Sequence, residues 1–210
     1  MGIVVKKYVE DDCLMGLWEV EEDFDTLYAR VLLDEDEKKT LYGFRNESRQ
    51  IEWLSVRALL NDLTQRDSKI IYNEEHKPFL FDNLFNISIS HSNKLTSILL
   101  SQHKRVGIDL EYMSHRINRI SHKFINENEY ITSNKAFEPL HMYIHWCAKE
   151  AIYKICDKKN INFRENLTII PFEIEHEGQI KCVHHDEHIH DEFLLKYEVR
   201  DNYVIVFCSQ

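Results

Sequence analysis

The chain has 210 residues, 43% of them hydrophobic, which is enough to build one large domain or two small ones. A net charge of −10 argues against a nucleic-acid surface, and the scattered cysteines without a C-x-x-C pair are typical of reduced thiols. No apolar run approaches the ~20 residues of a membrane span, and the N-terminal residues lack the pattern of a signal peptide. We therefore expect a cytoplasmic protein that binds neither membranes nor nucleic acid.

The first half of the chain combines strand patterns with one long helical pattern. A short helix is expected at 24–33. A long helical stretch at 34–63 opens on acidic residues, which suit the positive end of a helix dipole, and a break is allowed at Gly43. A turn is expected at 73–78. The strands predicted in this half are 3–9, 13–20, 70–72, 85–91 and 95–101.

The second half begins with a strand at 105–111 and one or two short helices within 113–134. Asn126 and Glu129 have the spacing of a capping box, which predicts the start of the second of these helices. A strong helix is predicted at 138–157, with Pro139 tolerated in its first turn. The remaining predicted strands are 167–175, 179–183, 193–199 and 203–207.

Strands and a long helix thus occur in similar proportion in both halves. This order predicts an α+β fold of two similar halves, residues 1–104 and 105–210, in a pseudo-twofold arrangement with the active site between them. No sequence repeat is visible, so the duplication is inferred from the order of the elements alone.

Two short runs carry the strongest chemical signal. Asp109 and Glu111 alternate on a predicted strand and therefore point to the same face. Glu150 and Lys154 are four residues apart on a predicted helix and stack on one side. Three carboxylates brought together repel one another unless a cation joins them, and hard oxygen ligands of that number suit Mg²⁺. The neighbouring lysine would then face a phosphate.

Read together, four motifs resemble the 4′-phosphopantetheinyl transferase superfamily, in its monomeric type with two related halves. The resemblance covers roughly residues 45 to 157, and the remaining segments match in element type only. The motifs are Lys77-Pro78-Phe79, Ser90-His91-Ser92, Gly107-Ile108-Asp109-Leu110-Glu111, and Trp146-Cys147-Ala148-Lys149-Glu150-Ala151 followed by Lys154.

The resemblance implies an enzyme of the holo-[acyl-carrier-protein] synthase type. Such enzymes transfer the 4′-phosphopantetheine arm of coenzyme A to a serine of an acyl or peptidyl carrier protein and release adenosine 3′,5′-bisphosphate. Mg²⁺ is the implied cofactor, with Mn²⁺ as an alternative, and coenzyme A is the substrate. Two other readings stay open at this point: a Mg²⁺-dependent phosphodiesterase or nuclease, and an inactive module that binds coenzyme A or a carrier protein.

The resemblance also implies roles for individual residues. Coenzyme A contacts are expected mainly in the first half, and the metal site and catalytic helix in the second. Glu150 is expected to act as a general base, a metal ligand or both, and Lys154 to stabilise charge on the leaving group. The expected metal ligands are Asp109, Glu111 and Glu150. The expected coenzyme A contacts are Arg57, Lys77, Ser90, His91, Lys149 and Lys154, with Arg45 and Arg49 as weaker candidates.

Each assignment has a structural alternative. His91 can instead cap a strand or turn, the two acids of the strand can be solvated, and the lysines and glutamate of the helix can form ordinary ion pairs. His76 stands where the family commonly has a glycine, so the local turn before Lys77 is expected to differ.

Two surface features complete the interpretation. A short helix with Arg116, Arg119 and Lys123 on one side, and Ile117, Ile120 and Phe124 on the other, is predicted to dock the acidic carrier protein through a basic and apolar surface. The alternative is that its apolar residues are buried. The histidine-rich run 184–190 matches no zinc spacing and is expected to span a hairpin between two late strands. We expect the protein to be a monomer.

Overall fold

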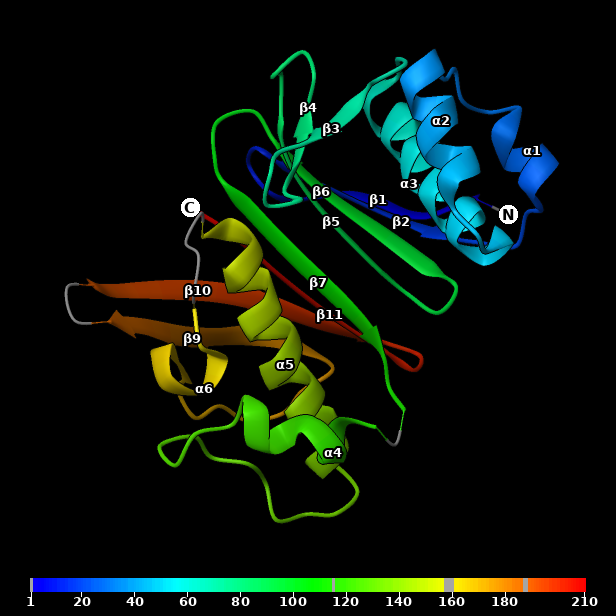
Figure 1. The fold of residues 1–210 in the computed structure, drawn as a ribbon. Helices are drawn as coiled ribbons and strands as arrows, with labels where there is room; N and C mark the ends of the chain where they lie inside the picture. Colours follow the sequence, from blue (N-terminus) through cyan, green and yellow to red (C-terminus); the bar gives the residue numbers. More distant parts are fainter. Residues whose placement is uncertain (1, 115, 157–160, 187–188) are drawn as a thin grey trace. The chain divides into compact units, whose positions relative to one another are not determined.

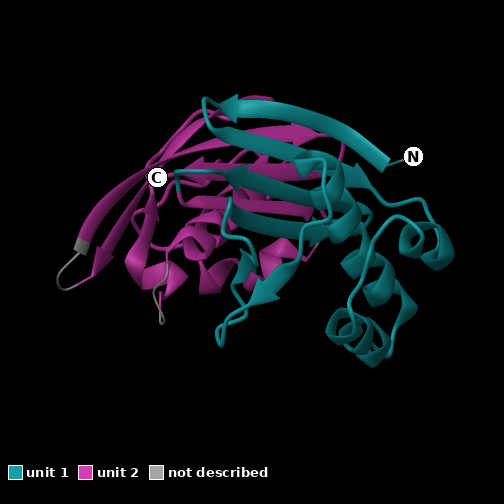
Figure 2. Ribbon diagram, turned by 90° about the horizontal axis from the view of Figure 1, so that it is seen from above, with its two compact units in different colours: residues 1–104 teal, residues 105–210 magenta. Residues whose placement is uncertain are grey.

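The computed structural model describes residues 2–114, 116–156, 161–186 and 189–210. The chain is of the α+β class. It divides into two compact units, residues 1–104 and 105–210, which Figure 2 shows in teal and magenta. Each unit has its own buried apolar cluster. Among the described residues, none of the helices combines the length and apolarity needed to cross a membrane.

Unit 1 is built on an antiparallel sheet in the order β1-β2-β6-β5. A separate two-stranded ladder joins β3 to β4. The strands are β1 (Gly2–Glu10), β2 (Cys13–Glu19), β3 (Ile70–Tyr72), β4 (Pro78–Leu80), β5 (Asn86–Ser92) and β6 (Leu95–Ser101).

One long helix, α3 (Glu47–Thr64), covers the unit 1 sheet and contacts β2 and β6. It follows α1 (Phe24–Tyr28) and α2 (Glu35–Gly43). The predicted long helix therefore ends at Gly43 and resumes after Asn46, whose side chain accepts the Ser48 amide hydrogen. Asp34 begins α2 with a capping box to Glu37, as the acidic first turn suggested.

Unit 2 is built on a second antiparallel sheet in the order β7-β11-β10-β9-β8. Its long helix α5 (Glu138–Ile155) lies across β7 and β11, as the yellow-green helix in Figure 1 shows. Apolar residues spaced along α5 pack on the sheet and build the core of the unit. The strands are β7 (Val106–Tyr112), β8 (Leu167–Ile169), β9 (Glu177–Asp186), β10 (Ile189–Arg200) and β11 (Tyr203–Ser209).

The short helices and strands between the long elements differ most from the sequence prediction. Helix α1 ends at Tyr28 instead of residue 33, β8 is shorter than predicted, and β4 begins at Pro78, the last residue of the expected turn. Helix α6 (Phe163–Asn166) lies outside the predicted elements, and the predicted end of the long helix of unit 2 at residue 157 lies outside the described residues.

The predicted helix after Asn126 does not form, although its capping bond does. The Asn126 backbone amide donates to Glu129 Oε2 over 2.9 Å, but residues 125–134 continue as turns and coil. The acid is held by partners from elsewhere in the unit, because Glu129 also pairs with Lys149 and accepts the Ile169 amide hydrogen. The helical part of 113–134 is α4 (Ile117–Ile120) with the 3-10 turn Ser121–Lys123.

Candidate functional site

The close approach of α5 to β7 forms the framework of the site. A Cβ atom added at Gly107 would lie 2.1 Å from the backbone oxygen of Ala151, so only glycine lets the helix backbone come this near the strand. This contact explains the glycine of the Gly-Ile-Asp-x-Glu motif in physical terms. It also sets the next residues of β7 against the polar side of α5.

Lys154 links the two elements directly. Its Nζ donates to Asp109 Oδ1 over 2.7 Å and to the Ile108 carbonyl over 2.9 Å. The Asp109 side chain is 7% exposed and that of Lys154 is 26% exposed. The lysine thus neutralises a nearly buried carboxylate while one side of the pair still reaches solvent.

Glu150 lies near the same pair, one helical turn before Lys154. Burial, together with repulsion from the carboxylates of Asp109 and Glu111, raises the pKa of Glu150 to about 7 against the opposing effect of Lys154. The three acids predicted as metal ligands therefore influence one another electrostatically. The single ammonium group of Lys154 does not balance the combined negative charge of these three carboxylates.

Cys147 is a residue of this site that the sequence interpretation missed. Its thiol is fully buried, and burial followed by the charge of Asp109 holds the pKa of the thiol well above its usual range. A thiol in this state is not a nucleophile at neutral pH. Its position one helical turn after Tyr143, on the sheet-facing side of α5, is the only sequence signal of its burial.

In the part of the chain that the structure describes, no group of three or more histidine, cysteine, aspartate or glutamate side chains is arranged to hold a metal ion as the side chains now stand. The donor chemistry of Asp109, Glu111 and Glu150 nevertheless fits a hard divalent cation, since all three offer carboxylate oxygens. The raised pKa of Glu150 is what such a group shows when its charge lacks a sufficient counterion.

Lys149 is buried, which differs from its predicted role as a coenzyme A contact. Its ammonium group is fully buried and contacts Glu129 Oε2 at 2.8 Å. Three backbone carbonyls also accept from it, those of Phe124, Phe163 and Leu167. We assign Lys149 a structural role, because protein oxygens already surround its charge and solvent does not reach it.

His91 lies at the exposed end of β5 and pairs with Glu52 of α3, Nε2 to Oε2, at 2.9 Å. Together they line a pocket of about 300 Å³. Ser90 is buried, and its carbonyl accepts a hydrogen bond from Ser97 Oγ, so the backbone of this motif is fixed by β6. Lys94 is the one lysine of the pocket lining, which also contains Glu21 and Glu22.

Lys77 follows a turn that Asn73 organises. The Asn73 side chain accepts the backbone amide hydrogens of Glu75 and Lys77. His76 adopts a φ of 61°, the left-handed region that glycine occupies at little cost. Histidine thus adopts here a backbone conformation that favours glycine, at some cost in strain.

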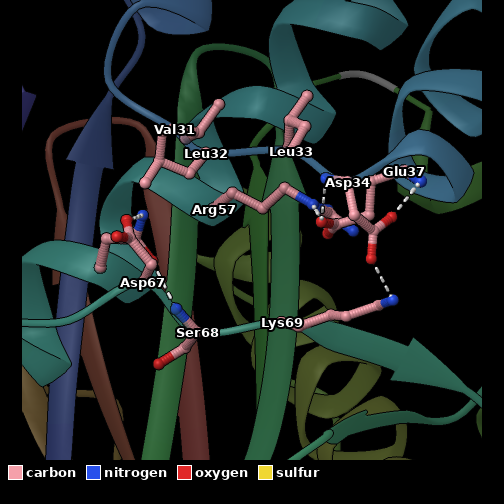
Figure 3. A pocket seen from close by; sticks show the side chains of 10 residues that line it. Val31, Leu32, Leu33, Asp34, Glu37, Arg57, Asp67, Ser68 and Lys69 are labelled. Carbon is pink, nitrogen blue, oxygen red and sulfur yellow. Dashed lines mark hydrogen bonds and ion pairs between the residues drawn. The ribbon is translucent and has the colours of Figure 1, made fainter.

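Arg57 is buried in unit 1 instead of lying on a solvated helix face. Its Nε donates to Glu37 Oε1 over 3.0 Å, and its guanidinium stacks 3.1 Å from the centroid of the Trp53 ring. The pair lines a pocket of about 340 Å³ beside the Lys69–Asp34 ion pair, shown in Figure 3. As the structure stands, the charge of Arg57 is already paired with the carboxylate of Glu37.

The weaker arginine candidates and the predicted dock are both exposed in part. Arg45 and Arg49 are exposed near the start of α3, and Arg49 pairs with Glu52. Arg116, Arg119 and Lys123 are exposed around α4. The apolar half of the predicted dock is wrong, because Ile117 and Phe124 are buried in the unit 2 core and Ile120 is half-buried against it.

Two comparisons with known proteins bear on this chain, and the family match falls on the segment that carries the carboxylate site. The chain is 33% identical over 115 residues to the 4′-phosphopantetheinyl transferase gsp of Aneurinibacillus migulanus, an alignment that covers 53% of this chain and 44% of that protein. The chain thus spans less than half the length of this curated relative. Residues 105–208 match the family described as the 4′-phosphopantetheinyl transferase superfamily. Unit 2, with Asp109, Glu150 and Lys154, therefore coincides with the segment that matches this superfamily.

Proposed function

We propose that this protein transfers the 4′-phosphopantetheine arm of coenzyme A to a serine of an acyl or peptidyl carrier protein. The observation that carries the proposal is the Lys154–Asp109 pair beside Glu150, within the segment that matches the superfamily. The name of the curated relative supports the same reaction.

In the proposed reaction the carrier serine Oγ forms a bond to the β-phosphorus of coenzyme A, and the pyrophosphate P–O bond breaks. The leaving group is adenosine 3′,5′-bisphosphate. Glu150, with a pKa of about 7, accepts the serine proton at a carboxylate oxygen. Lys154 stabilises the charge that develops on the leaving phosphate.

We further propose that Asp109, Glu111 and Glu150 hold one Mg²⁺ or Mn²⁺ ion during this reaction. When bound, the ion would neutralise charge on the pyrophosphate oxygens. Because Lys154 pairs with Asp109 in this structure, Asp109 would have to give up this contact to hold the ion, and the ammonium group of Lys154 would then be available to a phosphate. For unit 1 we retain His91 and Lys77 as proposed coenzyme A contacts.

Three functional classes are separated by one measurement. The protein is mixed with an apo carrier protein, coenzyme A and Mg²⁺, and the masses of the carrier and the nucleotide products are recorded. The proposal predicts a carrier one phosphopantetheine heavier and release of adenosine 3′,5′-bisphosphate. Nucleotide cleavage without a heavier carrier would indicate a phosphodiesterase, and tight coenzyme A binding without either product would indicate an inactive binding module.

Variants then test the assigned residues. Asp109→Asn keeps the shape of the side chain but removes the charge that pairs with Lys154, and we expect transfer to fall by about 10²–10³-fold. Lys154→Ala is expected to reduce transfer to a similar extent. Asp11→Asn, an acid at the exposed turn between β1 and β2, serves as the matched control and should leave transfer unchanged. Full turnover in both site variants would refute the assignment.

A further inference from the structure

We propose that His185 and His190 form a two-imidazole binding site for a borderline divalent transition-metal ion such as Cu²⁺, Ni²⁺ or Zn²⁺. The two histidines are direct partners in the antiparallel ladder between β9 and β10. Directly opposed residues of such a ladder project from the same face, with Cβ atoms about 4.5–5.5 Å apart. This geometry places two imidazoles where both can reach one ion.

Strand alternation turns this pair toward solvent. His184, the preceding residue on β9, is buried and lies opposite Asp191 on β10. His185 and His190 point to the opposite face, and both are exposed. A metal ion in solution therefore has direct access to the pair without any rearrangement of the core.

The backbone under the pair is held in place on one side by neighbouring elements. The Asn166 side-chain amide donates to the His185 carbonyl over 3.2 Å, and Leu167 of β8 pairs with His184. Strand β9 thus lies fixed between β8 and β10. Two ligands on a fixed backbone bind an ion more tightly than two independent imidazoles, because little conformational freedom is lost on binding.

The chemistry of the ligands selects the class of metal. Neutral imidazole nitrogens suit Zn²⁺, Cu²⁺ and Ni²⁺, with Cu²⁺ expected to bind most tightly, whereas Mg²⁺ prefers oxygen ligands. The pair supplies two coordination positions and leaves the others to water or an external ligand. The proposed site is distinct from the carboxylates of β7 and α5 in both its position and its ligand type.

The test uses tag-free protein in excess Mg²⁺, titrated with Cu²⁺ or Zn²⁺ against a metallochromic indicator. We expect one equivalent to bind, and His185→Ala and His190→Ala each to weaken binding by at least about tenfold, since a chelate becomes a single ligand. His176→Ala is the matched control: His176 is an exposed histidine of the same unit and lies outside the β9–β10 ladder, so binding should not change.

Electron paramagnetic resonance of the Cu²⁺ form gives an independent readout. Wild-type protein should show two coordinating imidazole nitrogens, and each variant only one. Unchanged affinity in both variants, or an equal loss in His176→Ala, would overturn the proposal. Phosphopantetheine transfer should be the same in all three variants, so failure of the metal site would leave the proposed reaction untouched.

Discussion

The two 18-residue helices, α3 in unit 1 and α5 in unit 2, each cover an antiparallel sheet above a strand glycine, but they come to different distances from it. A Cβ atom at Gly16 would meet the side-chain ends of Leu59 and Leu63 of α3 at 2.8–2.9 Å. At Gly107 it would meet the backbone of α5. Leucine side chains fill the space under α3, whereas α5 lies directly on its strand.

The same two helices also use a basic residue in different ways. Arg57 of α3 has one carboxylate partner, Glu37, and both side chains are nearly inaccessible. Lys154 of α5 pairs with Asp109, yet two further carboxylates, Glu111 and Glu150, act on the same region. A balanced and buried pair is what a structural contact requires. An excess of negative charge at a partly open pair is what a cation site requires.

The largest expected effect comes from breaking the balanced pair. Arg57→Met leaves Glu37 buried without its cation, and the free energy of unfolding should fall by about 3–5 kcal/mol. Denaturant unfolding of the purified protein measures this. The double variant Arg57→Met with Glu37→Leu should recover most of the loss, because neither buried charge remains. If the single variant unfolds like wild type, Arg57 is not a structural residue and its proposed role in substrate binding regains weight.

The glycine comparison predicts the next effect. Gly107→Ala forces the α5 backbone away from β7 and should lower the free energy of unfolding by at least about 3 kcal/mol. Gly16→Ala meets only flexible leucine ends, and we expect a loss of about 1 kcal/mol. Thermal unfolding of the two variants side by side tests the difference. Equal losses would mean that the two helices are held equally far from their strands.

These contrasts mark what could be predicted from the sequence. Periodicity located the long helices and most strands, and residue spacing placed Glu150 one turn before Lys154, because both signals depend on residues close together in the chain. The partners of Lys149 and Arg57 could not be predicted, since Glu129 and Glu37 lie 20 residues away from them. The spacing of Asn126 and Glu129 was misleading. Their capping hydrogen bond forms, but it forms in a turn, because Glu129 also accepts the amide hydrogen of Ile169 from another part of the unit.

The pKa of Glu150 gives a prediction with a definite sign. The folded protein keeps this proton up to a pH of about 7, whereas the unfolded chain loses it near 4.5, so the group makes folding less favourable as the pH rises through that window. Without divalent cations, Glu150→Gln should raise the free energy of unfolding at pH 8 by about 1–3 kcal/mol. At pH 4 the variant and wild type should unfold alike.

Repeating the unfolding measurement with Mg²⁺ tests the proposed metal site as well. If Asp109, Glu111 and Glu150 hold a cation, millimolar Mg²⁺ should stabilise wild-type protein at pH 8 and stabilise Glu150→Gln less, because the variant lacks one charged ligand. Glu127→Gln, an exposed acid of the same unit, is the control. If Glu150→Gln is no more stable than wild type at pH 8 without Mg²⁺, ionisation of Glu150 does not lower the free energy of unfolding.

The smallest expected effect concerns the exposed charges around α4. Because Ile117 and Phe124 are buried, any docking surface there consists mainly of Arg116, Arg119 and Lys123, and such charges act on the rate of encounter more than on the final contact. Reversing the charge of Arg116 and Arg119 to glutamate should slow association with an acidic carrier about tenfold at low salt. The difference should vanish at high salt, where charges on the surface are screened.

Stopped-flow association at two ionic strengths measures this directly, and the same variant should unfold like wild type because both side chains are exposed. Arg200→Glu, at an exposed arginine at the end of β10, controls for the change in net charge that each of the two reversals causes. An equal slowing in the control would assign the effect to overall charge. Unchanged association in the double variant would place the carrier on another surface, since a chain with a net charge of −10 must meet an acidic partner through a locally basic region.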